Sequence, residues 1–227
     1  LSRKIRELTN GRIVGVDPAE GMIREAVEKG EGLDITFEVK SAEELDYKDC
    51  FDVIFCNSAL QWFSDPERAI ENCYIALRRG GRIGVQAPAK KVYNPNFVEA
   101  VGRVREDPRT KDIFSHFRNP WFLLEKMEEY EELFEKHNLR VVFSKMEKVE
   151  TRHTPEEVFN IFSSGAVAGY LNQDHYDVEL NADYVAAFNE IVGDAFLRQA
   201  NSHGEVAMVF NRIFLVAIKD KTIPIRR

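Results

Sequence analysis

The chain has 227 residues, of which 44% are hydrophobic and 30% are charged, and its formal net charge is −7. This composition is typical of a globular protein and excludes a disordered one. The acidic balance argues against a general nucleic-acid binder, which needs a basic face to neutralise phosphates. No apolar stretch approaches the ~20 residues of a membrane span, so we expect no membrane partner.

The three cysteines, Cys50, Cys56 and Cys73, form no CxxC pair. An odd number of cysteines favours a reducing compartment, so we expect a cytoplasmic protein whose thiols serve as small buried hydrophobes. Residues 1–10 are too highly charged to resemble a signal peptide. The basic end of the chain, residues 221–227, is interpreted as a solvated tail.

The first part of the chain alternates between strand and helix patterns. Short β-branched or apolar runs predict strands at 12–17, 34–39, 51–56 and 81–89, and helical spacing predicts helices at 20–30 and 66–81. The run FDVIFC is apolar on both faces, as a central parallel strand should be. The alternation predicts right-handed βαβ units and therefore a Rossmann-like, doubly wound α/β fold with a mostly parallel sheet.

The rhythm changes after Pro88. Apolar periodicity predicts helices around 96–106, 123–138 and 182–201, and strands at 139–150 and 211–220, the last antiparallel to the sheet. Thr154, followed by a proline and by Glu157, predicts a capping box at the start of another helix. We expect one domain over residues 1–227, in which two insertions, 91–120 and 152–205, cap the carboxyl edge of the sheet.

Asp17 ends the first predicted strand. An acidic residue at this point of a nucleotide-binding βαβ unit binds ribose hydroxyls, about 20 residues after a glycine-rich turn. That turn would lie upstream of Leu1, and the given residues contain no GxGxxG. We therefore expect the chain to begin inside the fold, after its first strand and glycine loop, with Ile5 and Leu8 on a helix that faces the sheet. The alternative is that Asp17 only caps a loop.

Four stretches, in this order, carry a family resemblance: GVDPAEGMIREA, SAEEL, FDVIFCNSALQWFSDPERAI and LRRGGRIGVQ. Together they resemble a class I S-adenosylmethionine-dependent methyltransferase. They are most similar to the branch of the trans-aconitate and malonyl-acyl-carrier-protein methyltransferases. The resemblance covers residues 1–90 well and the C-terminal strand loosely.

The resemblance implies a cofactor site for S-adenosylmethionine and its demethylated product, S-adenosylhomocysteine. Asp17 would bind both ribose hydroxyls, and Met22 would pack on the adenine unless it serves the core. The Ala42 backbone and the Glu43 side chain would meet the adenine edge, although Glu43 also suits a solvated helix start. Asn57 would place the methionine end of the cofactor at the carboxyl edge of the sheet.

On the acceptor side the resemblance implies Gln61 and Trp62. It also implies Tyr170, because FSSGAVAGYL is similar to a helix-entry stretch that the same branch places near its acceptor, and the chain adds Arg118 in HFRNPWF. Trp62 also suits the core, and Arg118 a surface loop. No base constellation is visible, and the five histidines show no metal-binding spacing, so we assign neither a catalytic residue nor a metal. An acceptor that needs no base is a carboxylate, which the resemblance to this branch also favours.

The resulting expectation is a methyltransferase that acts on a small or carrier-linked acceptor, with a carboxylic acid as the candidate acceptor. Two other functions stay open. A nicotinamide-dependent oxidoreductase would share Asp17, but none of the tyrosines begins a YxxxK pair. A degenerate methyltransferase-like protein would bind a partner without activity, a reading that the missing glycine loop motivates.

Overall fold

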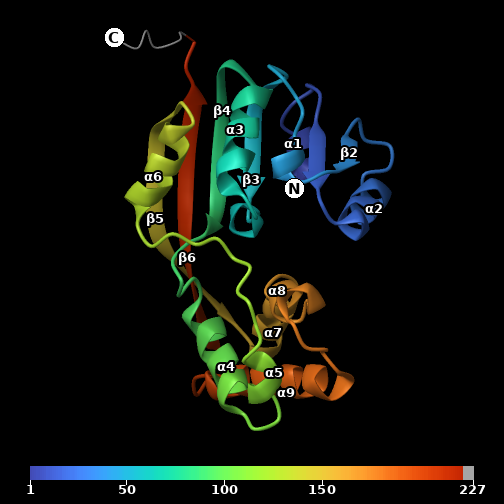
Figure 1. The fold of residues 1–227 in the computed structure, drawn as a ribbon, viewed down its shortest axis with the longest axis vertical. Helices are drawn as coiled ribbons and strands as arrows, with labels where there is room; N and C mark the ends of the chain where they lie inside the picture. Colours follow the sequence, from blue (N-terminus) through green and yellow to red (C-terminus); the bar gives the residue numbers. More distant parts are fainter. Residues whose placement is uncertain (222–227) are drawn as a thin grey trace.

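The strands of the protein fall into two sheets (Figure 1). The computed structural model describes residues 1–221, and the expected tail at 222–227 lies outside the described residues. The smaller sheet pairs β1 (Val14–Asp17) with β2 (Thr36–Val39) in parallel. The larger sheet has the order β3-β4-β6-β5, with β3 Phe51–Asn57, β4 Leu77–Pro88, β5 Leu139–His153 and β6 Val206–Lys219.

Only β6 runs against its neighbours. β3 is parallel to β4, whereas β6 is antiparallel to both β4 and β5. The predicted α/β class, with a mostly parallel sheet and an antiparallel C-terminal strand, is confirmed.

The expectation that 51–56 forms a strand buried on both faces is wrong for the described residues. β3 lies at the edge of its sheet, where Val53 is 59% exposed and Phe55 is 47% exposed. The reason is that β1, the last strand of the smaller sheet, is hydrogen-bonded to β2 but not to β3. An apolar run reports the environment that a strand prefers, and it cannot show which strand is its neighbour.

The helices of the first part cover these strands: α1 Ser2–Arg6, α2 Glu20–Lys29, the 3-10 turns η1 Ala42–Glu44 and η2 Leu60–Trp62, and α3 Pro66–Ala76. α3 begins as predicted, with Pro66 in its first turn and with Asp65 accepting a hydrogen bond from the Arg68 N–H. It ends at Ala76 rather than at the expected glycines. The Ala76 carbonyl accepts a hydrogen bond from the Cys50 N–H, and buried Lys219 donates to the Leu77 carbonyl at 2.6 Å.

The expected role of Leu8 is also wrong. α1 ends at Arg6, so Leu8 lies beyond the helix and is exposed rather than packed on the sheet. Ile5, inside α1, is half-buried.

A helical unit follows the sheet at its lower end in Figure 1. It contains α4 Pro95–Glu106, α5 Lys111–Phe114, α7 Pro155–Ser163, α8 Val167–Tyr170, η3 Gln173–His175 and α9 Ala182–Arg198. Its aromatic core is separate from the core that α6 (Met127–Lys136) forms on the larger sheet, which includes Tyr130, Phe134 and Leu215. The predicted capping box at the start of α7 is present, because Thr154 and Glu157 each accept from the backbone N–H of the other.

A two-stranded ribbon connects the sheet to the helical unit. β6 pairs with β4 only over 212–218, whereas its ladder with β5 continues to Val206 opposite His153. β3 and β4 end on the side of the sheet where the helical unit lies (Figure 1). The ribbon therefore holds this unit beside the carboxyl ends of two parallel strands, where ligands of α/β sheets bind. No helix among residues 1–221 combines the length and the apolar character that a membrane span requires.

Phe97 is a test of the helical core. This buried ring contacts Phe162 at 5.0 Å, Phe196 at 5.7 Å and Phe210 on β6 at 5.6 Å. We expect Phe97→Ala to lower the free energy of unfolding by about 3–5 kcal/mol, because it leaves a cavity among rings that cannot close around it. Urea denaturation measures this change. Leu197→Ala, at an exposed position of α9, serves as the control and should change the same quantity by less than about 0.5 kcal/mol.

Glu67 at the start of α3 is a test of the contact with α6. Its carboxylate lies 2.6 Å from both Lys136 Nζ and His137 Nε2, and the hydrogen bond from Lys136, then that from His137, lowers the Glu67 pKa below 4.5. A lowered carboxyl pKa contributes stability above the unfolded-state value and loses it as the pH falls through the folded-state value. The stability difference between the wild type and Glu67→Gln should therefore shrink below about pH 4.5. A difference that stays constant on acidification would contradict this assignment.

Candidate functional site

Asp17 stands at the carboxyl end of β1, where the chain turns into α2. Its Oδ1 accepts a hydrogen bond from the Ala19 N–H at 2.9 Å, so the carboxylate does stabilise this turn. No other protein group among residues 1–221 donates to it, and the side chain is half-buried. One carboxylate oxygen thus holds the loop while the other is left for a hydroxyl donor.

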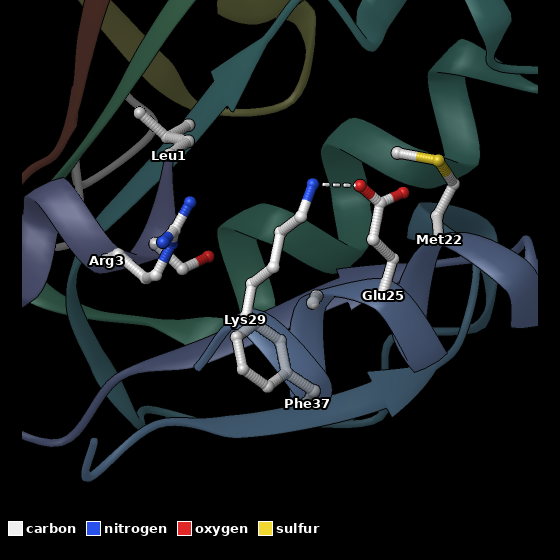
Figure 2. Close-up of a pocket in the computed structure, with 8 residues that line it drawn as sticks. Leu1, Arg3, Met22, Glu25, Lys29 and Phe37 are labelled. Carbon is white, nitrogen blue, oxygen red and sulfur yellow. Dashed lines mark hydrogen bonds and ion pairs between the residues drawn. The ribbon is translucent and has the colours of Figure 1, made fainter. Parts of the chain in front are cut away.

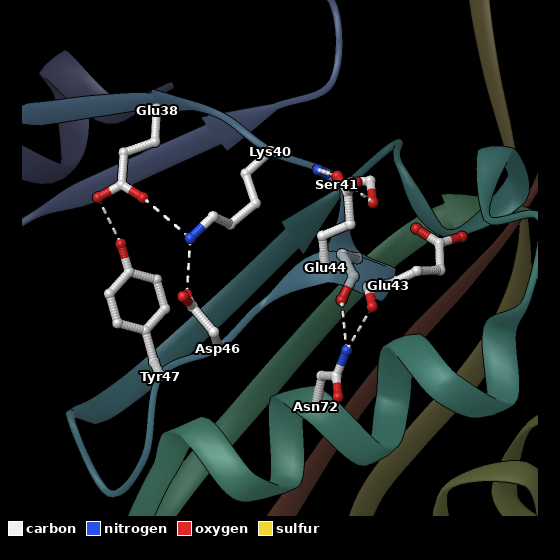
Figure 3. A network of polar contacts seen from close by, with 9 residues as sticks. Glu38, Lys40, Ser41, Glu43, Glu44, Asp46, Tyr47 and Asn72 are labelled. Carbon is white, nitrogen blue, oxygen red and sulfur yellow. Dashed lines mark hydrogen bonds and ion pairs between the residues drawn. The ribbon is translucent and has the colours of Figure 1, made fainter.

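The loop after β2 is fixed by a polar network (Figure 3). Lys40 Nζ lies 2.6 Å from Asp46 and 3.5 Å from Glu38, and Tyr47 Oη donates to Glu38 at 2.5 Å. Burial, followed by the hydrogen bond to Glu38, raises the pKa of Tyr47 to about 12, so this phenol stays protonated. Asn72 of α3 holds η1, which carries Ala42, because its Nδ2 donates to the Ala42 carbonyl at 3.3 Å.

Glu43 faces the start of α3 rather than an open edge. Its Oε1 accepts from the Ser64 N–H at 2.8 Å and from the Asp65 N–H at 3.3 Å, while Asn72 Nδ2 donates to the Glu43 carbonyl at 2.8 Å (Figure 3). Partial burial would raise the pKa of Glu43, but hydrogen bonds from backbone N–H groups and from Ser64 outweigh it and lower the pKa. The hydrogen bonds of the Glu43 carboxylate therefore join η1 to the start of α3.

Met22 lies on α2 and is 55% exposed, so it does not pack in the core. It lines a pocket of about 170 Å³ with Arg3, Lys29 and Phe37 (Figure 2). Glu25 and Lys29 form an ion pair on the same wall. Asp17 and Asn57 are not part of this pocket, which therefore does not unite the expected cofactor residues.

The end of β3 turns sharply into η2. Asn57 is exposed and pairs in register with Gln86 of β4, and Ser58 follows with a φ of 52°. This left-handed conformation costs a non-glycine residue roughly 1–3 kcal/mol, and such conformations cluster at functional sites. The Ser58 N–H donates to the Gln86 carbonyl at 2.6 Å, which joins the carboxyl ends of β3 and β4.

Gln61 and Trp62 form the last part of η2. Gln61 is 7% exposed, and its Nε2 donates to the Ser58 carbonyl at 2.8 Å. Trp62 is 38% exposed, and its ring centre lies 5.7 Å from that of Trp121. The Phe122 N–H donates to the Gln61 carbonyl at 2.9 Å, so the 115–122 segment is bound directly to the loop after β3.

Trp121 is the centre of an aromatic group that we call the Trp121 group. Besides Trp62, it packs against three other rings. Its ring centre lies 4.7 Å from that of Tyr170 on α8 and 6.1 Å from those of Tyr93 and Phe117. The structure thus brings together two residues predicted for the acceptor side, Trp62 and Tyr170, through a third. Tyr93 was not anticipated from the sequence, because nothing in the segment after β4 marks one tyrosine as turned toward η2.

Arg118 is not part of this group. Its backbone N–H donates to the His175 carbonyl, and its guanidinium makes no hydrogen bond or ion pair among residues 1–221. His116 pairs with Asp177 at 2.7 Å, away from Trp121. The basic residues of HFRNPWF therefore lie outside the aromatic group, and only its Trp and first Phe belong to it.

No group of three or more potential metal ligands occurs among residues 1–221. Cys56 and Cys73 are poor nucleophiles, because burial raises the pKa of the Cys56 thiol to about 11 and that of the Cys73 thiol to about 12. The site therefore offers positioning and water exclusion rather than an evident base or nucleophile.

Comparison with known proteins finds a family model that matches part of the chain. Residues 1–85 match the sequence model of a family described as a methyltransferase domain. This region runs from α1 into β4 and contains Asp17, η1, Asn57, Gln61 and Trp62. A search of curated proteins finds no match to the chain.

Solved structures share the fold of the whole chain. The [4+2]-cyclase SpnF is similar at 16% identity with a TM-score of 0.56, covering 97% of this chain and 71% of its own. YcgJ from Bacillus subtilis is similar at 18% identity and a TM-score of 0.55, covering 93% and 83%. Phosphoethanolamine N-methyltransferase 2 from Haemonchus contortus, solved with S-adenosyl-L-methionine, is similar at 17% identity and 0.53, covering 96% of this chain and 45% of its own. These likenesses establish the Rossmann-like fold of methyltransferases.

Proposed function

We propose that the protein is an S-adenosylmethionine-dependent methyltransferase that acts on a small or carrier-linked acceptor. The observation that carries the proposal is that the family match ends before the helical unit begins. The matched region, residues 1–85, contains the strand ends and loops that bear the expected donor residues, and the helical unit beside them lies outside the match. Of the expected acceptor residues, Gln61 and Trp62 also lie in the matched region, whereas Arg118 and Tyr170 lie outside it. A shared donor region with an acceptor side that is partly the chain's own fits a family of enzymes that share a cofactor and differ in substrate.

The residues present fit the cofactor unequally. Asp17 keeps a carboxylate oxygen for ribose hydroxyls, and exposed Met22 can supply a polarizable thioether beside an adenine ring. Ala42 is held in place by α3, and Asn57 is exposed at the strand end. Glu43 fits least well, because Ser64 and Asp65 already use its carboxylate.

When bound, the cofactor supplies a methyl group that is activated by its bond to a sulfonium. The acceptor attacks the methyl carbon in line with that bond, and the sulfur leaves as a thioether. The residues of the chain then have two tasks. They hold the acceptor at the carboxyl ends of β3 and β4, and they exclude water from it. Gln61, Trp62 and Tyr170 lie where they can do both.

A carboxylate acceptor is the version that the sequence favours, with Arg118 as its cationic partner. Arg118 is exposed and separate from the Trp121 group, so this version has the weaker support. We also keep the cytoplasmic location as part of the proposal, on the basis of the three unpaired cysteines.

A second candidate is a methyltransferase-like protein with another role. SpnF is described as a cyclase, so this fold does not by itself fix methyl transfer. A nicotinamide-dependent oxidoreductase is the remaining alternative. Calorimetric titration of the purified protein with S-adenosylhomocysteine, S-adenosylmethionine and NADH separates the three. Binding of either sulfur ligand without NADH supports the proposal, and the absence of both contradicts it.

Asp17 allows a specific test of the donor site. We expect Asp17→Ala to weaken S-adenosylhomocysteine binding by roughly 10–100-fold, because a charged hydrogen-bond acceptor is lost. Asp17→Asn retains an oxygen for the Ala19 N–H, so it preserves the turn while it removes the charge. It should weaken binding nearly as much without the loss of thermal stability that Asp17→Ala causes. If calorimetry gives Asp17→Asn the affinity of the wild type, Asp17 serves only as a loop cap.

A further inference from the structure

A buried polar atom next to the Trp121 group in the chain has no protein partner. Gln61 Oε1, in the residue before Trp62, makes no hydrogen bond among residues 1–221. Tyr93 differs, because burial, followed by a hydrogen bond with Tyr170, raises the pKa of its hydroxyl. Buried polar atoms in native proteins almost always have partners, so the free Gln61 oxygen points to a ligand that supplies one.

The orientation of the Gln61 amide determines what that ligand must carry. Its Nε2 donates to the Ser58 carbonyl, and a carbonyl cannot donate, so this contact identifies which end of the amide is nitrogen. The free atom, Oε1, is therefore a hydrogen-bond acceptor. The group that satisfies it must present an N–H or an O–H, which an ionised carboxylate does not have.

The rings of the group provide the second criterion. Cations lie over several rings elsewhere, for example Arg105 over Phe114 and Lys219 over Tyr74. Among residues 1–221 no Lys or Arg lies over Trp62, Trp121 or Tyr170. Trp and Tyr faces attract ammonium groups, most strongly where water is excluded.

We infer that Gln61 and the Trp121 group form the acceptor subsite and that the acceptor is an amine attached to an apolar or aromatic body. This inference rests on the proposed methyl transfer. Gln61 is 7% exposed and Tyr93 is 8% exposed, so the amine reaches them when a covering ring moves. Trp62 is the candidate for this movement, because it follows Gln61 in the chain and is 38% exposed.

The transfer step balances without a further reagent. The lone pair of the neutral amine forms a bond to the methyl carbon, and the carbon–sulfur bond breaks with its electron pair going to sulfur. The sulfonium becomes a neutral thioether, and the methylated ammonium releases a proton to solvent. The aromatic faces bind the amine as an ammonium, which loses a proton to solvent before the transfer, and a hydrogen bond from one remaining N–H to Gln61 Oε1 orients the lone pair.

Gly169 positions the central ring. A Cβ at this residue would lie 2.3 Å from Trp121 Cζ2 and 2.9 Å from Trp121 Cε2. Only glycine therefore allows Trp121 to pack against α8 in this way. A Cβ at Gly165, four residues earlier, would meet nothing within 4 Å. The pair gives a matched perturbation and control within one segment.

Intrinsic tryptophan fluorescence measures binding at this subsite, because the two tryptophans of the chain are Trp62 and Trp121. We expect phenethylamine to change the emission saturably, whereas hydrocinnamate, which replaces the amine with a carboxylate, does not. Gly169→Ala should weaken the binding of phenethylamine by roughly tenfold or more, and Gly165→Ala should leave it unchanged. Gln61→Leu, which removes the free oxygen, should weaken it similarly even if Gly169→Ala folds poorly. Gly165→Ala should retain the wild-type affinity for S-adenosylhomocysteine.

The outcomes separate this inference from the proposed function. Preferential binding of hydrocinnamate, or no emission change with phenethylamine in a protein that binds S-adenosylhomocysteine, overturns the amine subsite and leaves methyl transfer standing. Equal effects of Gly165→Ala and Gly169→Ala overturn the role of Trp121. Binding of phenethylamine by a protein that binds neither sulfur ligand overturns the assignment as a methyl acceptor.

Discussion

The ladder between β5 and β6 is the interaction on which the rest of the arrangement depends. Its part nearest the C-terminus is shared with β4, and the remainder extends past the sheet with only these two strands. The helical unit and the larger sheet each have their own apolar core, so packing alone does not position one against the other. The ribbon of β5 and β6 sets the distance between the two cores, and the hydrogen bond from the Phe122 N–H to the Gln61 carbonyl joins them a second time. A site made by two cores needs this kind of rigid spacing, because alignment of reacting groups tolerates little error.

Most of the fold could be predicted from the sequence because its elements carry local signals. Hydrophobic spacing located the helices and strands, and Pro66 and Thr154 mark helix starts that side-chain caps confirm. The sequence predicts the end of α3 too far along the chain, because the glycines of the following turn are a common local signal for a helix end. The carbonyls at its actual end are instead bound by Cys50 and Lys219, which are distant in sequence. The same limit explains β3, since strand partners depend on contacts that no local pattern contains.

The two halves of the candidate site differ in how much the sequence could reveal. The donor half is formed by strand ends and the turns that follow, so order and spacing suffice to identify Asp17 and Asn57. The acceptor half is formed by residues from four separated segments that meet at Trp121. Tyr93 and Gly169 gain their importance only from that meeting, and the left-handed backbone of Ser58 cannot be inferred from its residue type. For Glu43 the sequence suggests a ligand role that the structure does not favour, because the Glu43 carboxylate already accepts hydrogen bonds from its protein neighbours.

The open edge of β3 has a consequence for solution behaviour. Its backbone is paired on one side only, and Val53 and Phe55 are exposed on it. Natural sheets blunt such edges with charge, proline or a bulge, and β3 has two of these near its beginning: the charged Asp52 and an irregularity of register between Phe51 and Val53. Beyond them the strand is a template for β-augmentation, on which another extended apolar segment can gain main-chain hydrogen bonds and side-chain burial together.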